Sequence, residues 1–239
     1  MSKLPPYSVN PPMSMPSVQF KTNSIDGNAQ TCCIKDLQHS YIKIVRESST
    51  SYYICLTVDP TPLYRIEFSK DPSAVGDILV FPASNSSSVA VAAARLAKNP
   101  KRKEPVATIC TLSPHRPDAK WRPLLKSSLL AIGEEYKSSI PIVTVPGMQP
   151  TAKSFAWRTA LSNPYFQLCW DGPLLHQPAR AYIDSEQDFR HLFATFVMKG
   201  GDESQDNLIE MRRGGGLEFE LTVVLELFAI LYQMNKQLL

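Results

Sequence analysis

The segment "LTVVLELFAILYQM", residues 221–234, is the feature that most constrains how this chain can fold. A run of this length without turn residues favours a helix over a strand. On a helical wheel, apolar side chains cover three sides of that helix, and the polar ones fall on one narrow edge: Thr222, Glu226, Gln233 and Gln237. We therefore expect a helix at about residues 218–237 that needs an apolar environment on nearly every side.

Either lipid or protein could supply that environment. The hydrocarbon core of a bilayer requires roughly 20 apolar residues, whereas this run is about 14 residues long and carries Glu226 in its middle. We expect no transmembrane segment, and a helix enclosed by the rest of the chain as a plug formed by Leu225, Phe228 and Leu231. The Glu226 carboxylate must then reach the mouth of the enclosure or pair with a cation such as Arg212 or Arg213.

The enclosing wall is predicted from residues that alternate with a period of two. In "SYYICLTV" one face carries Tyr52, Ile54, Leu56 and Val58, and in "PLYRIEF" one face carries Tyr64, Ile66 and Phe68. The turn sequence "DPTP" joins these runs, so they form a predicted hairpin. Similar short runs follow at residues 77–81, 89–96, 106–112, 140–145, 154–161, 165–170, 181–184, 192–198 and 208–213.

Turn residues separate most of these runs, and only "PLLKSSLLAIGEEYKSS" has the pattern of a short helix, at residues 124–136. About a dozen strands without regular intervening helices favour a meandering antiparallel sheet. A closed β-barrel of about 12 strands is wide enough to hold a helix. The predicted fold class is therefore mainly β, a closed antiparallel barrel around a C-terminal hydrophobic helix.

Two parts of the chain differ in composition. Residues 1–37 contain "PPYSVNPPMSMPS" and a polar run with little periodicity, so we expect a disordered N-terminal arm that could reach a protein partner. Residues 38–239 form the expected barrel domain.

This order of elements resembles the tubby-like C-terminal superfamily, which includes tubby proteins, phospholipid scramblases and plant LURP-one-related proteins. The resemblance covers about residues 41–239, and it is most specific in "SYYICLTVDPTPLYRIEF" and in the last strand, glycine loop and apolar helix. It implies a barrel threaded by its terminal helix, and phosphoinositide binding by basic residues.

Cysteine usage indicates a reducing compartment. Five cysteines leave at least one unpaired, and no segment has the pattern of a secretory signal, so we expect a cytoplasmic protein, with a peripheral membrane or nuclear location left open. Cys55, Cys110 and Cys169 lie in apolar runs and are expected to pack in the core. Cys32 and Cys33 lie in a polar stretch, where an exposed pair and an acylated pair both stay open.

Catalytic and metal-binding patterns are missing from the sequence. The four histidines have no metal-ligand spacing with each other or with the cysteines, and "RRGGG" lacks the lysine and hydroxyl residue of a phosphate-binding loop. We expect no enzyme, no cofactor and no metal. The formal net charge of +3 is also too small to indicate a nucleic-acid partner.

One loop concentrates positive charge. The stretch "AKNPKRKEP" holds Lys98, Lys101, Arg102 and Lys103. It is interpreted as a solvated hairpin tip, a nuclear-localisation signal or a site for anionic lipid headgroups. Further candidates for headgroup binding are Lys120 and Arg122, which together with Lys126 surround Trp121; this tryptophan is interpreted as an interfacial anchor or as a cap on the barrel end.

The sequence therefore predicts a non-enzymatic intracellular β-barrel module that binds an anionic membrane, phosphoinositide in particular, or a protein. Two alternatives stay open. The first is a small-ligand-binding or hydrolytic enzyme with its site at the barrel mouth. The second is a plain scaffold without affinity for lipid.

Overall fold

The structure is a computed structural model that describes residues 37–59, 61–83, 89–101, 103–129, 133–144, 147–159, 165–171, 192–197 and 207–234. The chain divides into two units, residues 1–30 and 31–239, and all described residues belong to the second. Several predictions fall outside the described residues: the arm at 1–36, the pair Cys32 and Cys33, Arg102, and the strand at 181–184.

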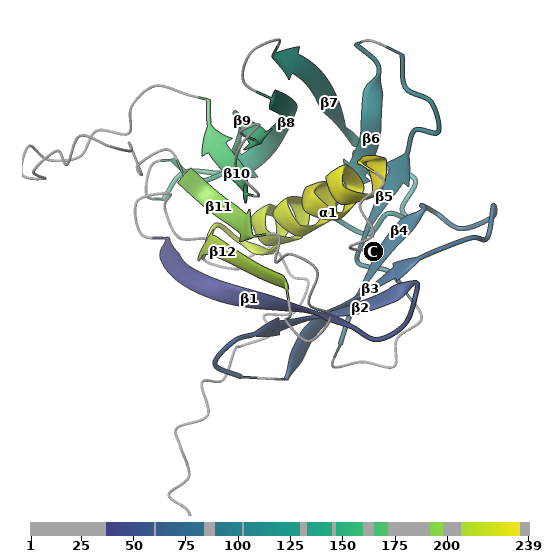
Figure 1. Cartoon of the computed structure of the whole chain (residues 1–239), viewed down its shortest axis with the longest axis horizontal. Helices are drawn as coiled ribbons and strands as arrows, with labels where there is room; N and C mark the ends of the chain where they lie inside the picture. Colours follow the sequence, from purple (N-terminus) through teal and green to yellow (C-terminus); the bar gives the residue numbers. More distant parts are fainter. Residues whose placement is uncertain are drawn as a thin grey trace, which may run out of the picture. The chain divides into compact units, whose positions relative to one another are not determined.

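Twelve antiparallel strands close into a barrel around one helix, α1 (Figure 1), which confirms the predicted fold class. In chain order the strands are β1 (Gln38–Arg46), β2 (Ser51–Leu56), β3 (Pro62–Phe68), β4 (Ile78–Pro82), β5 (Ala92–Leu96), β6 (Pro105–Cys110), β7 (Arg122–Leu129), β8 (Gly133–Ile142), β9 (Thr151–Thr159), β10 (Tyr165–Trp170), β11 (Leu192–Val197) and β12 (Asn207–Arg213). Each strand pairs with the next one, and β12 pairs with β1 to close the barrel.

The possible short helix at residues 124–136 is wrong, because residues 124–129 belong to β7 and residues 133–136 to β8. Leu125 pairs with Lys137 and Lys126 with Tyr136, so cross-strand pairing overrides the local helical pattern. The run at 140–145 is likewise no separate strand, since β8 extends to Ile142.

The predicted alternation in the first hairpin holds up to the end of β2. Tyr52, Ile54 and Ile66 are buried. Val58, however, was assigned to the same inward face and is 90% exposed, because β2 ends at Leu56 and Val58 lies in the loop beyond it.

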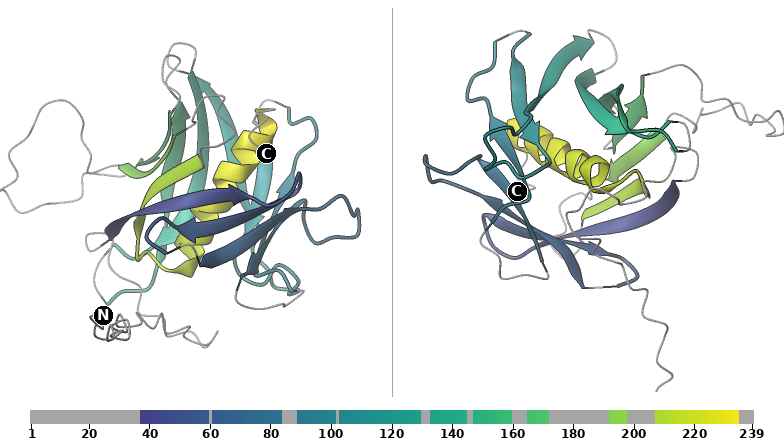
Figure 2. Two further views of the ribbon diagram at one scale, coloured as in Figure 1. Left: turned by 60° about the horizontal axis from the view of Figure 1, so that its bottom comes forward. Right: turned by 180° about the vertical axis from the view of Figure 1, so that it is seen from behind.

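A turn of three glycines, residues 214–216, connects β12 in the barrel wall to α1 in the barrel interior. Gly214 and Gly216 adopt positive φ values of 105° and 96°, which residues with a Cβ rarely do. A Cβ at Gly215 would lie only 3.0 Å from the Phe219 side chain. α1 then spans Leu217–Gln233 and runs through the barrel interior (Figure 2).

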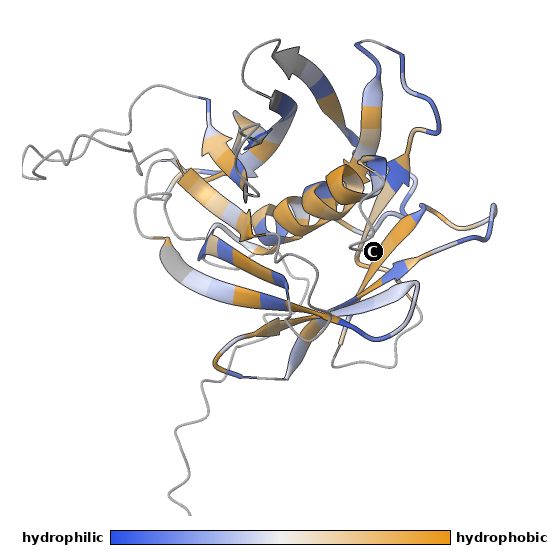
Figure 3. Ribbon diagram, viewed as in Figure 1, coloured by the Kyte–Doolittle hydropathy of each residue, from blue (hydrophilic) through white to orange (hydrophobic). Residues whose placement is uncertain are grey.

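The helix and the inner faces of the strands form one hydrophobic core. Figure 3 shows the mostly hydrophobic helix within a wall in which hydrophobic and polar residues alternate. Leu225, Phe228 and Leu231 are buried, and the Phe228 ring lies 5.5 Å from Tyr52 between ring centroids. α1 does not meet the length and hydropathy that a membrane-crossing helix requires.

Antiparallel pairing places alternate loops at opposite ends of the barrel. We call the end with the loops that follow even-numbered strands the even end, and the opposite one the odd end. α1 follows β12, so it begins at the even end, and it finishes at the odd end, where Gln233 contacts the loop between β5 and β6.

Candidate functional site

An open cleft lies at the odd end, between the end of α1 and the loop that joins β5 to β6. Its volume is about 640 Å³. The side chains around it are both charged and aromatic, and include Asp77, Lys98, Asn99, Pro100, Tyr232 and Gln233. The cleft therefore adjoins the basic loop predicted from the sequence.

The last residue of α1 anchors this loop. The Gln233 side-chain amide Nε2 donates hydrogen bonds to the carbonyl oxygens of Ala97, at 2.8 Å, and Val106, at 3.2 Å. The Ala97 amide also donates to the Val106 carbonyl at 2.9 Å, so the base of the loop is closed. The loop and the helix end are thereby held in one arrangement.

A tight turn displays the lysines of the loop. The Glu104 amide donates to the Lys101 carbonyl at 2.9 Å, and the Glu104 carboxylate accepts the Lys101 amide at 2.9 Å. Lys103 adopts a positive φ of 75°. Lys98, Lys101 and Lys103 are exposed, and none of the three forms an ion pair with a described residue.

Nearby carboxylates are engaged by the backbone. The Asp77 side chain, which lines the cleft, accepts the Leu96 amide at 2.7 Å through Oδ2. The Glu104 carboxylate accepts the Lys101 amide in the turn described above. The loop therefore presents ammonium groups whose charge the neighbouring acids do not neutralise by contact.

The other two predicted headgroup residues lie at the opposite end. Lys120 and Arg122 follow β6, whereas the basic loop precedes it. Since a strand advances about 3.3 Å per residue, the six residues of β6 separate the two groups by roughly 17 Å. The structure does not bring the predicted cations together into one site.

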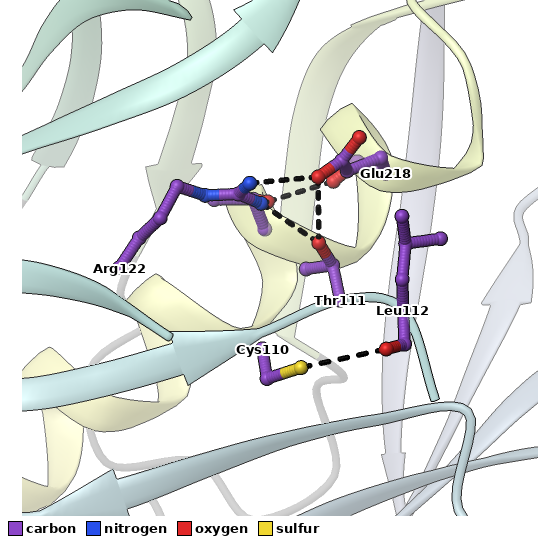
Figure 4. Close-up of polar contacts among 6 residues, drawn as sticks. Cys110, Thr111, Leu112, Arg122 and Glu218 are labelled. Atoms are coloured by element: carbon purple, nitrogen blue, oxygen red, sulfur yellow. Dashed lines mark hydrogen bonds and ion pairs between the residues drawn. The ribbon is translucent and has the colours of Figure 1, made fainter. Parts of the chain in front are cut away.

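Arg122 is committed to the helix rather than to solvent (Figure 4). Its guanidinium donates to the Glu218 carboxylate at 2.7 Å and to the Thr111 hydroxyl at 2.8 Å. A longer bond of 3.5 Å reaches the hydroxyl of Thr222. Arg122 thus fastens the first turn of α1 to β6 and β7, which makes it a structural residue.

Two of the three cations around Trp121, Arg122 and Lys126, have acidic partners. The Arg95 guanidinium lies 3.9 Å above the Trp121 ring, and Lys126 forms an ion pair with Glu134. Lys120 is exposed and forms no ion pair with a described residue. Of the three cations that surround Trp121 in the sequence, only Lys120 is available to an external anion.

A carboxylate is buried in the middle of the plug. Glu226 is 1% exposed, and its Oε2 accepts a hydrogen bond of 2.9 Å from Trp157 Nε1. Burial raises the pKa of the Glu226 carboxyl to about 7, although the Ser138 hydroxyl, Trp157 and the Arg122 charge oppose the shift. The Ser138 hydroxyl is itself buried and finds no full hydrogen bond among the described residues.

The expected partners of Glu226 lie elsewhere. The Arg213 guanidinium pairs with Glu220 at 2.8 Å, and the Arg212 guanidinium lies 5.2 Å from the centroid of the Phe193 ring. The prediction of an arginine partner from β12 is therefore wrong. Those two residues belong to the even end, close to the first turn of α1, whereas Glu226 lies more than two turns further along the helix.

The described cysteines and histidines provide neither an activated thiol nor a metal site. Cys55 and Cys110 are buried, and burial raises the pKa of the Cys169 thiol despite the neighbouring Arg158, which disfavours a reactive thiolate. No group of histidine, cysteine and carboxylate side chains among the described residues could hold a metal ion. His115 is exposed at the even end.

Comparison of the chain with known protein families, curated proteins and solved structures found no match. The barrel and its helix agree with the fold that a tubby-like protein would have. Membership of that superfamily stays a prediction.

Two residues of the site were not predicted as such. Gln233 was assigned only to the polar edge of the helix, and its position after the last apolar turn gave no indication of the backbone carbonyls that it binds. The second is Trp157, which is buried and donates to Glu226. A buried indole N–H usually finds an acceptor, so a tryptophan in an apolar strand and a lone carboxylate in an apolar helix together were a usable signal for the Trp157–Glu226 pair.

Proposed function

We propose that this protein is a non-enzymatic β-barrel module that binds anionic phosphate headgroups of a membrane through the loop between β5 and β6. The observation that carries the proposal is the set of exposed lysines, Lys98, Lys101 and Lys103, beside the cleft at the end of α1. Ammonium groups on flexible stems suit phosphates that differ in position and number.

Three features support a headgroup site over a merely solvated turn. The loop is anchored to the helix by Gln233, the adjacent carboxylates of Asp77 and Glu104 are held by backbone amides, and Tyr232 is half exposed at the cleft. An aromatic ring with a polar tip beside cations is typical of interfacial sites.

The test is sedimentation with vesicles of phosphatidylcholine containing a phosphoinositide. Each lysine near an acidic membrane contributes about 1 kcal/mol, so replacing Lys98, Lys101 and Lys103 with Ser should weaken binding roughly 100-fold at low salt. The charge-matched control replaces three lysines carried by strands, Lys126, Lys137 and Lys153, with Ser. Equal loss in both variants would attribute binding to net charge and overturn the proposal.

A second candidate is binding of a small soluble anion in the cleft. Its volume of about 640 Å³ lies within the usual range for small-molecule pockets. Titration calorimetry with a soluble inositol phosphate distinguishes the two. Binding that depends on Lys98 but is accompanied by no vesicle association would favour the soluble ligand.

A further inference from the structure

Large apolar side chains are exposed mainly at one end of the barrel. Every loop residue concerned follows an even-numbered strand: Val58 after β2, Val89 after β4, Leu112 after β6 and Met148 after β8, while Leu217 begins α1 after β12. We call these five residues the apolar rim. At the odd end, the described loops, residues 47–50, 69–77, 97–101 and 103–104, expose no large apolar side chain, while Tyr232 of α1 is 50% exposed at the cleft.

Backbone contacts place most of the rim on neighbouring loops. The Ala83 amide donates to the carbonyl of Leu63 in β3 at 3.2 Å, which extends the pairing of β3 and β4 to the start of the loop that carries Val89. The Ser113 amide donates to the Val91 carbonyl at 3.1 Å, which joins the loops of Leu112 and Val89. The Thr111 hydroxyl donates to the Glu218 carboxylate (Figure 4). Leu112 follows Thr111 and Leu217 precedes Glu218 in the chain, so this bond brings the two leucines to the same part of the barrel end.

The exposure is large for apolar side chains. Leu112 is 58% exposed, Met148 64% and Leu217 49%. Single exposed apolar residues are common on protein surfaces, and they need no explanation when they are scattered. Here they gather at one end, on four separate loops and on the first residue of α1.

The charges at this end are compatible with phosphate headgroups. Four acids are each engaged: Glu218 with Arg122, Glu220 with Arg213, Asp118 with Arg116, and Asp59 with the Thr61 amide. Lys120 remains exposed in the same loop as Leu112. Separate apolar side chains next to an exposed cation, with acids held by arginines or by a backbone amide, match a bilayer interface, into which each side chain can insert on its own.

We propose that the apolar rim inserts into the interfacial region of a lipid bilayer, with Lys120 at the level of the headgroups. This contact differs from the basic loop in position and in chemistry. It relies on apolar burial, so it tolerates salt and requires no anionic lipid, whereas binding through the lysines is weakened by salt.

The experiment is flotation of the full chain with pure phosphatidylcholine vesicles at about 0.5 M NaCl, where surface charges are largely screened. The wild type should float. Leu112→Ser combined with Met148→Ser should lower the partition coefficient by about tenfold, and Leu112→Phe combined with Met148→Phe should raise it several-fold. Leu125→Ser, on the outer wall of β7, is the matched control and should bind like the wild type.

Several results would overturn this inference. A wild type that stays with the soluble fraction at high salt but binds anionic vesicles at low salt through Lys98, Lys101 and Lys103 would refute the rim and leave the proposed function intact. So would rim variants that float like the wild type. A rim variant whose only change is a smaller mass in light scattering would assign the rim to contact between copies of the chain.

Discussion

Replacing Glu226 with Gln should make the protein more stable above neutral pH. The carboxyl is fully buried, and it accepts a hydrogen bond of 2.9 Å from Trp157 Nε1. A glutamine side chain at this position would be isosteric and would keep a carbonyl oxygen for the indole, but it would carry no charge. The substitution therefore separates the cost of the buried charge from the value of the hydrogen bond.

The pKa of this carboxyl rises from 4.5 to about 7 because burial penalises the ionised form. Between these values the folded state holds the proton and the unfolded state releases it, so stability falls as the pH rises from 4.5 to 7. A shift of about 2.5 pH units corresponds to roughly 3 kcal/mol at about 1.36 kcal/mol per unit. That stability is fully present below pH 4.5 and is lost above about pH 7.

The assay is reversible urea denaturation of the wild type and the Glu226→Gln variant at about pH 5 and about pH 8. The difference in unfolding free energy should move in favour of the variant by about 2 to 3 kcal/mol between the two pH values. Glu67→Gln, on the exposed outer wall, is the control. A variant that is equally destabilised at both pH values would show that the pKa of Glu226 is the same in the folded and unfolded states, and would refute this reasoning.

Two further predictions concern what holds the helix. Phe228→Ala should cost about 3 to 5 kcal/mol in denaturation experiments, because the ring fills the space between Tyr52 and Phe68 and its loss leaves a cavity; a loss below about 1 kcal/mol would contradict the packing. Arg122→Met should cost about 1 to 3 kcal/mol, since it leaves the mostly buried Glu218 unpaired, whereas Lys126→Met, in the more exposed pair with Glu134, should cost less than about 1 kcal/mol. Equal losses would argue against the difference in burial.

The sequence predicted the architecture because two strong periodicities coexist in it. Alternation with a period of two in most of the chain and an all-round apolar helix at its end leave few arrangements other than a helix inside a barrel. Prediction failed at residues 124–136, where Leu124 and Tyr136 point into the barrel from two different strands. Pairing with neighbouring strands determines the structure of that stretch, and the local sequence pattern carries no information about this pairing.

The candidate site was predictable in composition and not in position. The lysines of the basic loop were recognised from their density, but their anchoring by Gln233 depends on where α1 ends relative to β5 and β6. The sequence also contained the reason why the further candidates Lys120 and Arg122 lie apart from that loop. One predicted strand, at 106–112, already separated the two groups, and in an antiparallel barrel a single strand places its flanking loops at opposite ends.

The same rule yields a final prediction about the protein as a whole. If the basic loop binds anionic lipid at the odd end and the apolar rim inserts at the even end, one molecule can contact two bilayers, because the two surfaces face away from each other along the helix axis. The wild type should then cluster vesicles that contain phosphoinositide at low salt, seen as a rise in turbidity. The triple lysine variant and the rim variant should each still bind those vesicles without clustering them. Clustering that persists in either variant would mean that one end alone supports it, for instance through self-association. Binding that vanishes in both variants would mean that lipid contact needs both groups of residues on one surface. That result would contradict the topology of this barrel, which places the two groups at opposite ends.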